Sequence, residues 1–106
     1  MSRSLDVYYR EKYAGTLEEL SARRRYRFSY RADYSGPPVS LTMPTDRSVY
    51  EYDHFPPFFD GLLPEGVLLE ALLRTKKIDR DDWMSQLAAV GSDLVGAVSV
   101  REREKP

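Results

Sequence analysis

Residues 55–66 read FPPFFDGLLPEG, and this segment constrains the fold more than any other part of the chain. It contains three prolines and two glycines among aromatic and leucine side chains. Proline lacks an N–H and fixes its own φ, and glycine weakens a regular element, so we expect neither a regular helix nor an interior strand here. The chain therefore places a large apolar surface on an irregular segment, and that surface must be covered by something.

The residues before this segment alternate between apolar and polar side chains, which predicts short strands. We expect strands or extended segments at 5–9, 13–17, 26–30, 39–44 and 48–52. Along the segment 26–30 the aromatic side chains share one face and arginines occupy the other. The aromatic face holds Tyr26, Phe28 and Tyr30. We expect this face to pack in the core and the arginine face to meet water.

The residues after the segment predict two helices and a last strand. Between Gly66 and Lys77, apolar side chains would cover roughly 240° of a helix, whereas an ordinary surface helix has an apolar stripe of somewhat over ~100°. We expect a second helix with Asp79 as its N-cap and an end at Gly91, followed by a strand at 96–100. This order predicts an α+β fold: a small, mostly antiparallel sheet from the N-terminal half plus a C-terminal strand, packed with two helices.

Length, composition and charge narrow the class of protein. The 106 residues have a net charge of −1, no cysteine and no apolar run long enough to span a bilayer. We expect residues 1–106 to form a single cytoplasmic domain with a charged tail at about 101–106, and no association with a membrane.

Catalytic motifs are not found in the sequence. His54 is the one histidine, and a metal site needs about three or four ligands of this kind. No serine lies in a G-x-S-x-G elbow, and the glycines at 91 and 96 lack the G-K-[ST] ending of a phosphate-binding loop. We therefore expect no enzyme activity, no metal and no cofactor.

The Arg23–Arg31 strand allows a different function. Arginines interleaved with aromatics are typical of single-strand nucleic-acid platforms, in which rings stack on bases. The arginines concerned are Arg23, Arg24, Arg25 and Arg27. The strict alternation favours a two-faced strand, because the same rings cannot both stack on bases and form the core. A nucleic-acid-binding module, or a site for an acidic protein partner, remains an alternative.

Taken in order, four motifs resemble a known family. They are RFSYRADY, PPVSLTMP, PPFFDGLLPEG and VGSDLVGAVSV. Together they resemble the N-terminal subdomain of HipA-type serine/threonine kinase toxins, from about Leu5 to Val100. The P-F-F-x-x-L-L-P-E-G pattern is the most specific of the four. The sequence stops at Pro106, where the kinase core of a HipA-type protein would begin, and we therefore expect none of that core's functional residues here.

A separate copy of this subdomain is similar to the HipS-type antitoxins of three-gene HipBST systems. That resemblance implies an antitoxin of a tripartite toxin–antitoxin system, which binds and neutralises a separate HipT-like kinase without catalysis of its own. It also implies a HipB-like helix-turn-helix partner, through which nucleic acid is contacted only indirectly. The alternative within the same complex is a structural subunit that bridges or stabilises these partners without inhibiting the kinase.

The resemblance also implies where a partner would bind. Apolar surface that packs against the rest of a fused kinase becomes an intermolecular interface when the subdomain is separate. The alternative is that this domain's own sheet and second helix cover it, and Phe58 and Leu62 in particular are candidates for the core. We expect Val67 and Leu68 to project into a partner's cleft and Glu65 to meet a basic side chain. The predicted contact residues are Phe58, Phe59, Leu62, Leu63, Pro64, Glu65, Val67 and Leu68.

Overall fold

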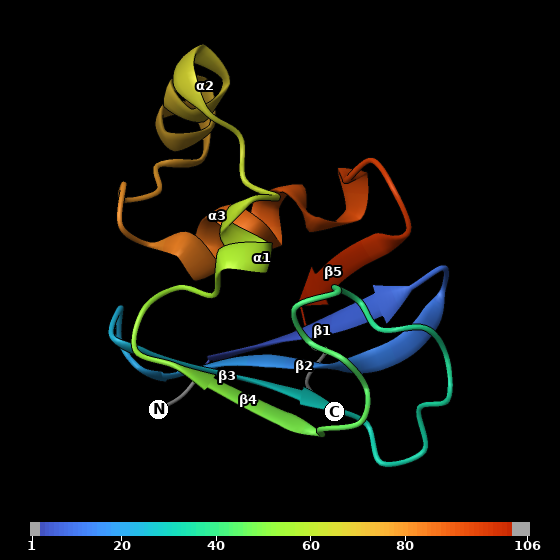
Figure 1. Ribbon diagram of the computed structural model, residues 1–106. Coiled ribbons are helices and arrows are strands. Elements are labelled where there is room, and N and C mark those ends of the chain that lie inside the picture. Colours follow the sequence, from blue (N-terminus) through green and yellow to red (C-terminus); the bar gives the residue numbers. More distant parts are fainter. Residues whose placement is uncertain (1–2, 103–106) are drawn as a thin grey trace.

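A computed structural model describes residues 3–102 as a five-stranded antiparallel sheet with helices on one face (Figure 1). The sheet order is β4-β3-β2-β1-β5. The strands are β1 Arg3–Tyr9, β2 Lys12–Ser21, β3 Arg25–Tyr30, β4 Val49–Tyr52 and β5 Val98–Glu102. The helices are α1 Pro57–Asp60, α2 Gly66–Lys76 and α3 Trp83–Val90, followed by the 3-10 turn η1 Gly91–Asp93. This confirms the predicted α+β class. Residues 103–106 of the predicted charged tail lie outside the described residues, and Arg101 and Glu102 belong to β5.

The two-faced character of β3 is confirmed. Tyr26, Phe28 and Tyr30 are all buried on the side of the sheet that α1 and α3 cover. On the opposite face Arg27 forms an ion pair with Glu51 of the neighbouring strand, at 3.1 Å. The core therefore lies between the sheet and one layer of helices, and it is rich in aromatic rings.

The segment that opens with Phe55 is more regular than the sequence predicts. Residues Pro57–Asp60 form the single turn α1, which tolerates proline because Pro57 is at its first position, where a missing N–H costs nothing. The Asp60 N–H donates to the Pro56 carbonyl at 2.9 Å. The expectation of no helix is therefore wrong for these four residues, and the rest of the segment is irregular.

The side chains of this segment close the core. The ring centroid of Phe59 lies 5.7 Å from that of Phe28, and Phe59 is fully buried. Phe55 contacts Tyr26 edge-on at 5.3 Å and stacks against Trp83 of α3 at 6.1 Å. These aromatic contacts fasten the segment to β3 and α3.

The predicted extended segment 39–44 is wrong, because these residues form turns. The Tyr30 hydroxyl accepts a hydrogen bond from the Val39 N–H at 3.0 Å and donates one to the Met43 carbonyl. A core side chain thus satisfies backbone groups that a strand would pair with a neighbour. Val39 and Met43 are buried and close one end of the core.

The predicted start of the second helix is also wrong. Asp82, and not Asp79, is the N-cap of α3, and its carboxylate accepts a hydrogen bond from the Ser85 N–H at 3.2 Å. Helix α3 ends at Val90, next to Gly91 as predicted. Its buried Met84 and Leu87 pack in the core beneath it.

We predict that Phe59→Ala costs about 3–5 kcal/mol of unfolding free energy, because it opens a cavity in the aromatic core. The matched change Val67→Ala, on an exposed position of α2, should alter stability by less than ~0.5 kcal/mol. Urea unfolding followed by circular dichroism measures both. Equal losses for the two variants would contradict the assignment of Phe59 to the core.

Candidate functional site

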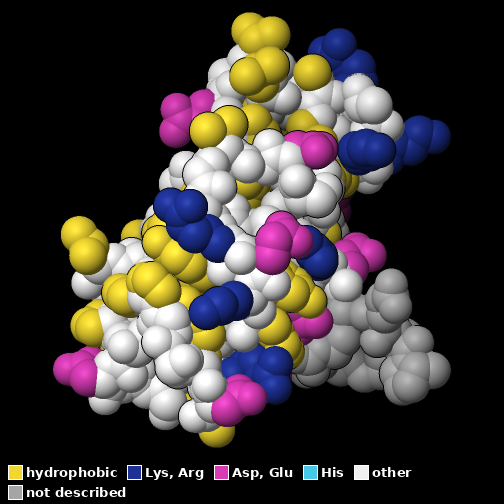
Figure 2. Space-filling view, turned by 90° about the vertical axis from the view of Figure 1, so that its right-hand side faces the viewer, with side chains coloured by type: hydrophobic (Ala, Val, Ile, Leu, Met, Phe, Trp, Pro, Cys, Tyr) yellow, Lys and Arg dark blue, Asp and Glu magenta, His cyan; other side chains and the backbone are white. Residues whose placement is uncertain are grey.

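Helix α2 stands apart from the rest of the fold. In Figure 1 it lies beyond α1 and α3, on the side away from the sheet. None of its residues is buried, and Val67 and Leu68 are 84% and 72% exposed. Figure 2 shows hydrophobic side chains gathered at the end of the molecule where α2 lies. Leu69, Leu72 and Leu73 are partly buried, so the domain covers the apolar surface of this helix only in part and leaves Val67 and Leu68 exposed.

The backbone at both ends of α2 fixes where the helix points. Gly66 begins the helix with φ of +58°, a conformation that a residue with a side chain adopts only at a cost. Lys77 ends it in the left-handed conformation, and its N–H donates to the Leu73 carbonyl. The Ile78 N–H donates to the same carbonyl at 3.0 Å. The chain thus turns sharply into and out of the helix.

The predicted contact residues divide into three groups. Phe59 is fully buried and packs in the core. Phe58, Leu62 and Leu63 are partly buried and pack against that core, and Pro64 is also partly buried. Glu65, Val67 and Leu68 are exposed. Contact with a partner remains a prediction for the whole set. Because Phe59 is buried, it supports the predicted contact surface from beneath and is not part of that surface.

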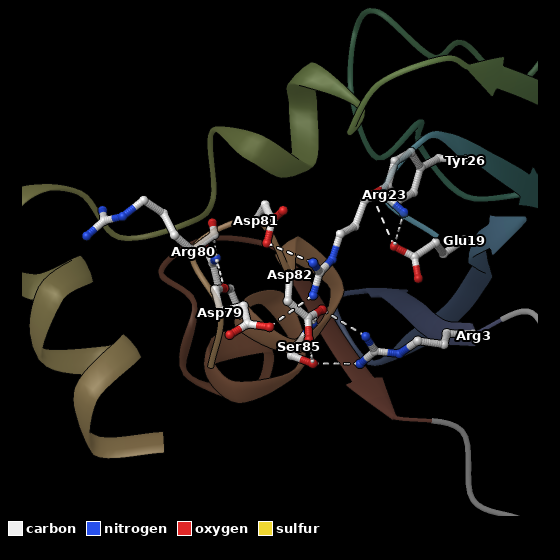
Figure 3. Close-up of polar contacts among 10 residues, drawn as sticks. Arg3, Glu19, Arg23, Tyr26, Asp79, Arg80, Asp81, Asp82 and Ser85 are labelled. Atoms are coloured by element: carbon white, nitrogen blue, oxygen red, sulfur yellow. Dashed lines mark hydrogen bonds and ion pairs between the residues drawn. The ribbon is translucent and has the colours of Figure 1, made fainter. Parts of the chain in front are cut away.

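Ion pairs anchor the connection between α2 and α3. The Arg80 guanidinium donates to both carboxylate oxygens of Glu70 on α2, at 2.9 and 2.7 Å. Arg23, in the turn between β2 and β3, pairs with Asp79 at 3.2 Å and with Asp81 at 3.1 Å (Figure 3). The connection is therefore tied to α2 on one side and to the sheet on the other.

Asp82 continues this network to the first strand. Its partial burial opposes ionisation, but hydrogen bonds from the Ser85 hydroxyl and backbone and from Arg3 outweigh that effect and lower the pKa of Asp82. Arg3 lies 2.8 Å from the Asp82 carboxylate and also donates to the Ser85 hydroxyl (Figure 3). The start of α3 is thus held to β1 by a charge-assisted contact.

A buried carboxylate lies beneath the turn that carries Arg23. Glu19 is buried, and its Oε2 accepts hydrogen bonds from the Arg23 N–H at 3.1 Å and the Tyr26 hydroxyl at 3.2 Å (Figure 3). Burial and the nearby Glu19 raise the pKa of Tyr26, so its hydroxyl stays protonated and can donate. The contact fixes the turn from which Arg23 reaches the connection between α2 and α3.

The fold does not favour the nucleic-acid alternative. A stacking platform needs accessible rings, and Tyr26, Phe28 and Tyr30 are buried. Arg27 pairs with Glu51, and Arg23 pairs with the aspartates that precede α3. The three rings thus serve the core, and Arg23, Arg25 and Arg27 form surface ion pairs.

His54, the remaining candidate for catalysis or metal binding, lies at the surface. His54 is exposed, and a hydrogen bond of 2.8 Å joins it to its neighbour Asp53 and lowers the pKa of Asp53. Its ring also lies edge-on to that of Tyr52, with the ring centroids 6.2 Å apart. Within residues 3–102, no group of three or more metal-ligating side chains comes together. Across the same residues, no helix combines the length and apolar character required to cross a membrane.

Sequence reasoning missed the residues that hold α2 in place. Glu70 and Arg80 are ten positions apart, so helix periodicity does not connect them. The spacing of Asp82 and Ser85 is that of an N-cap and its third helical residue, and this signal could have identified the correct cap. Gln86, the other buried polar residue, gives no signal in the sequence.

The geometry defines a small antiparallel-sheet domain that carries one uncovered helix. Comparison with known proteins agrees: residues 5–101 match the family described as the HipA N-terminal domain. The chain is 34% identical over 103 residues to a Haemophilus influenzae (strain ATCC 51907 / DSM 11121 / KW20 / Rd) protein of undescribed function, covering 97% of this chain and 95% of that one. A solved structure described as the N-terminal domain of HipA toxin aligns with a TM-score of 0.75 at 31% identity, covering 98% of this chain and 95% of the other.

The chain therefore belongs to the HipA N-terminal domain family. Its fold and family fit a HipS-like component of toxin–antitoxin systems.

We predict that Asp82→Ala destabilises the protein by about 1–2 kcal/mol at neutral pH, because the helix cap and the contact to Arg3 are lost. Since the pKa of Asp82 is lowered on folding, its contribution is fully present above the ordinary aspartate pKa of ~3.9. It is lost as the pH falls through the lower, folded-state pKa.

Urea unfolding of the wild type and of Asp82→Ala, from pH 7 down to pH 2, measures the difference in their unfolding free energies. Asp81→Ala is the control, because its exposed pair with Arg23 should contribute less than ~1 kcal/mol. A difference between wild type and Asp82→Ala that is independent of pH would contradict the electrostatic part of the prediction.

Proposed function

We propose that this protein is an antitoxin that binds a separate HipT-like serine/threonine kinase through α2 and holds it inactive. The observation that carries the proposal is the uncovered helix. Val67 and Leu68 project from a helix without a single buried residue, on a domain of the HipA N-terminal family. Exposed apolar side chains grouped on one element are typical of a surface that a partner protein covers.

The proposal includes no chemistry by this chain. Inhibition by occupancy requires only that α2 fill space the kinase needs, or hold the kinase in an inactive arrangement. A HipB-like helix-turn-helix protein would complete the assembly and contact DNA. Under this proposal the chain works in the cytoplasm, where the kinase acts.

The alternative of a structural subunit shares the same surface and differs in outcome. Such a subunit would bind the kinase and leave it active. Binding and kinase activity must therefore be measured together, on the same preparations.

We predict that Val67→Asp and Leu68→Asp each weaken binding to the proposed HipT-like kinase by about 2 kcal/mol or more, or roughly thirtyfold. An aspartate in an apolar contact loses its hydration without gaining a partner. Affinity is measured by calorimetry, and inhibition by kinase autophosphorylation and by growth of cells that express the kinase.

The matched controls are Leu41→Asp and Val95→Asp. Both side chains lie in loops outside α2 and are 93% and 100% exposed. Circular dichroism establishes that all four variants fold. We expect the controls to bind and inhibit as the wild type does. A kinase that is bound yet stays active would replace the antitoxin proposal with the structural-subunit alternative.

A further inference from the structure

Helix α2 has two apolar sides, and one of them is open to solvent. Leu69, Leu72 and Leu73 are partly buried and share one side, since residues three and four positions apart are neighbours on a helix. The exposed apolar residues at positions 67, 68 and 71 fall on the other side. We call Val67, Leu68 and Ala71 the outer face of α2. Alanine lies between the two larger side chains, so another helix can approach closely there.

The position of α2 leaves room for a second chain at this face. Figure 1 shows the helix at the end of the molecule, beyond α1 and α3 and away from the sheet. Figure 2 shows hydrophobic side chains at this end, with lysine and arginine side chains beside them. A molecule that covers the outer face can therefore contact α2 without touching the sheet.

The charges along α2 are divided between its two ends. Glu65 is exposed at the N-cap, and Arg74 and Lys76 are exposed in the last turn. The ion pair that fastens α2 to its own domain uses Glu70 and Arg80, so it engages none of these three. An acidic start and a basic end complement each other when two copies of the same helix run in opposite directions, and the two helix dipoles then also oppose each other favourably.

We propose that the free protein self-associates through this outer face, as a two-fold symmetric dimer in which two copies of α2 cross antiparallel. A two-fold axis makes every contact occur twice, so one self-complementary face is enough to build the dimer. The outer face of each copy covers that of the other. Glu65 of each copy then lies near Lys76 of the second copy.

The small size of the face sets the strength of the dimer. A helix rises 1.5 Å per residue, so the 11 residues of α2 span about 16 Å. Stable interfaces bury about 1,200–2,000 Å² in total, which is more than two helices of this length share. We therefore expect a weak dimer, populated above about 100 μM and largely dissociated below about 10 μM.

This self-association goes beyond the proposed function and does not require it. If the proposed function also holds, the kinase competes with the second copy for Val67 and Leu68, a consequence that rests on that proposal. The weaker contact between copies would then give way to the kinase, and it would cover the apolar face until the kinase binds.

Sedimentation of the full chain without any kinase, from about 5 to about 500 μM, measures the self-association across the expected range. We expect the average mass to rise from one chain toward two. Leu68→Asp should weaken the dimer at least tenfold, because it places a charge in the apolar contact. The matched control Leu41→Asp, in the exposed loop 31–48, should associate as the wild type does, and circular dichroism establishes that both variants fold.

A charge exchange tests the antiparallel crossing separately. Glu65→Lys and Lys76→Glu each place like charges opposite each other at two points, so each alone should weaken self-association roughly three- to tenfold. An equimolar mixture of the two variants should restore it, because a chain with two lysines at these positions then meets a chain with two glutamates. A variant that merely loosens its own helix would not be rescued by mixing.

A chain that stays monomeric up to about 500 μM overturns the inference, as does a dimer that Leu68→Asp leaves intact. A mixture that associates no better than its separate components also overturns it, because the antiparallel crossing requires the restored pairs. An average mass that increases beyond two chains contradicts a closed two-fold contact. These outcomes leave the proposed function standing, since that is tested by kinase binding alone.

Discussion

The structure depends on the packing of the proline-bounded segment against the aromatic face of β3. Phe59 meets Phe28, and Phe55 bridges Tyr26 to Trp83 of α3, so the segment and α3 together fill the space above the sheet. This layer buries Phe55 and Phe59, whereas no residue of α2 is buried. The apolar residues of this segment thus have two roles. The rings of Phe55 and Phe59 build the core, and the last residues of the segment lead into α2, which lies outside the core.

The second constraint is electrostatic and sets the position of α2 on the finished core. Arg80 holds the helix through Glu70, while Arg23 and Arg3 hold the connection that follows it. Each of these pairs is at least partly exposed, so each contributes little free energy alone. Their value is geometric, because they limit the orientations of a helix that has no buried side chain. A helix held in one orientation loses less entropy when a partner binds it.

Much of the fold could be predicted from the sequence, because the patterns that indicate its strands and helices are local. The alternation of Tyr26, Phe28 and Tyr30 gave the buried face of the sheet, and the wide apolar surface between Gly66 and Lys77 marked α2 as unusual. The predictions that failed concern local structure that depends on residues distant in the chain. The turns of 39–44 exist because the Tyr30 hydroxyl bonds their backbone, and the choice of Asp82 over Asp79 as cap is supported by Arg3.

The central claim is that α2 is the surface by which this domain meets its partner. Hydrogen–deuterium exchange of the chain, free and with the proposed HipT-like kinase, tests it most directly. The account predicts that amides of residues 66–76 exchange fastest among the helical amides in the free protein and become protected on addition of the kinase, while the strands are unchanged. Protection that arises on the sheet face bearing Arg27 and Glu51, with α2 exchanging as before, would contradict it.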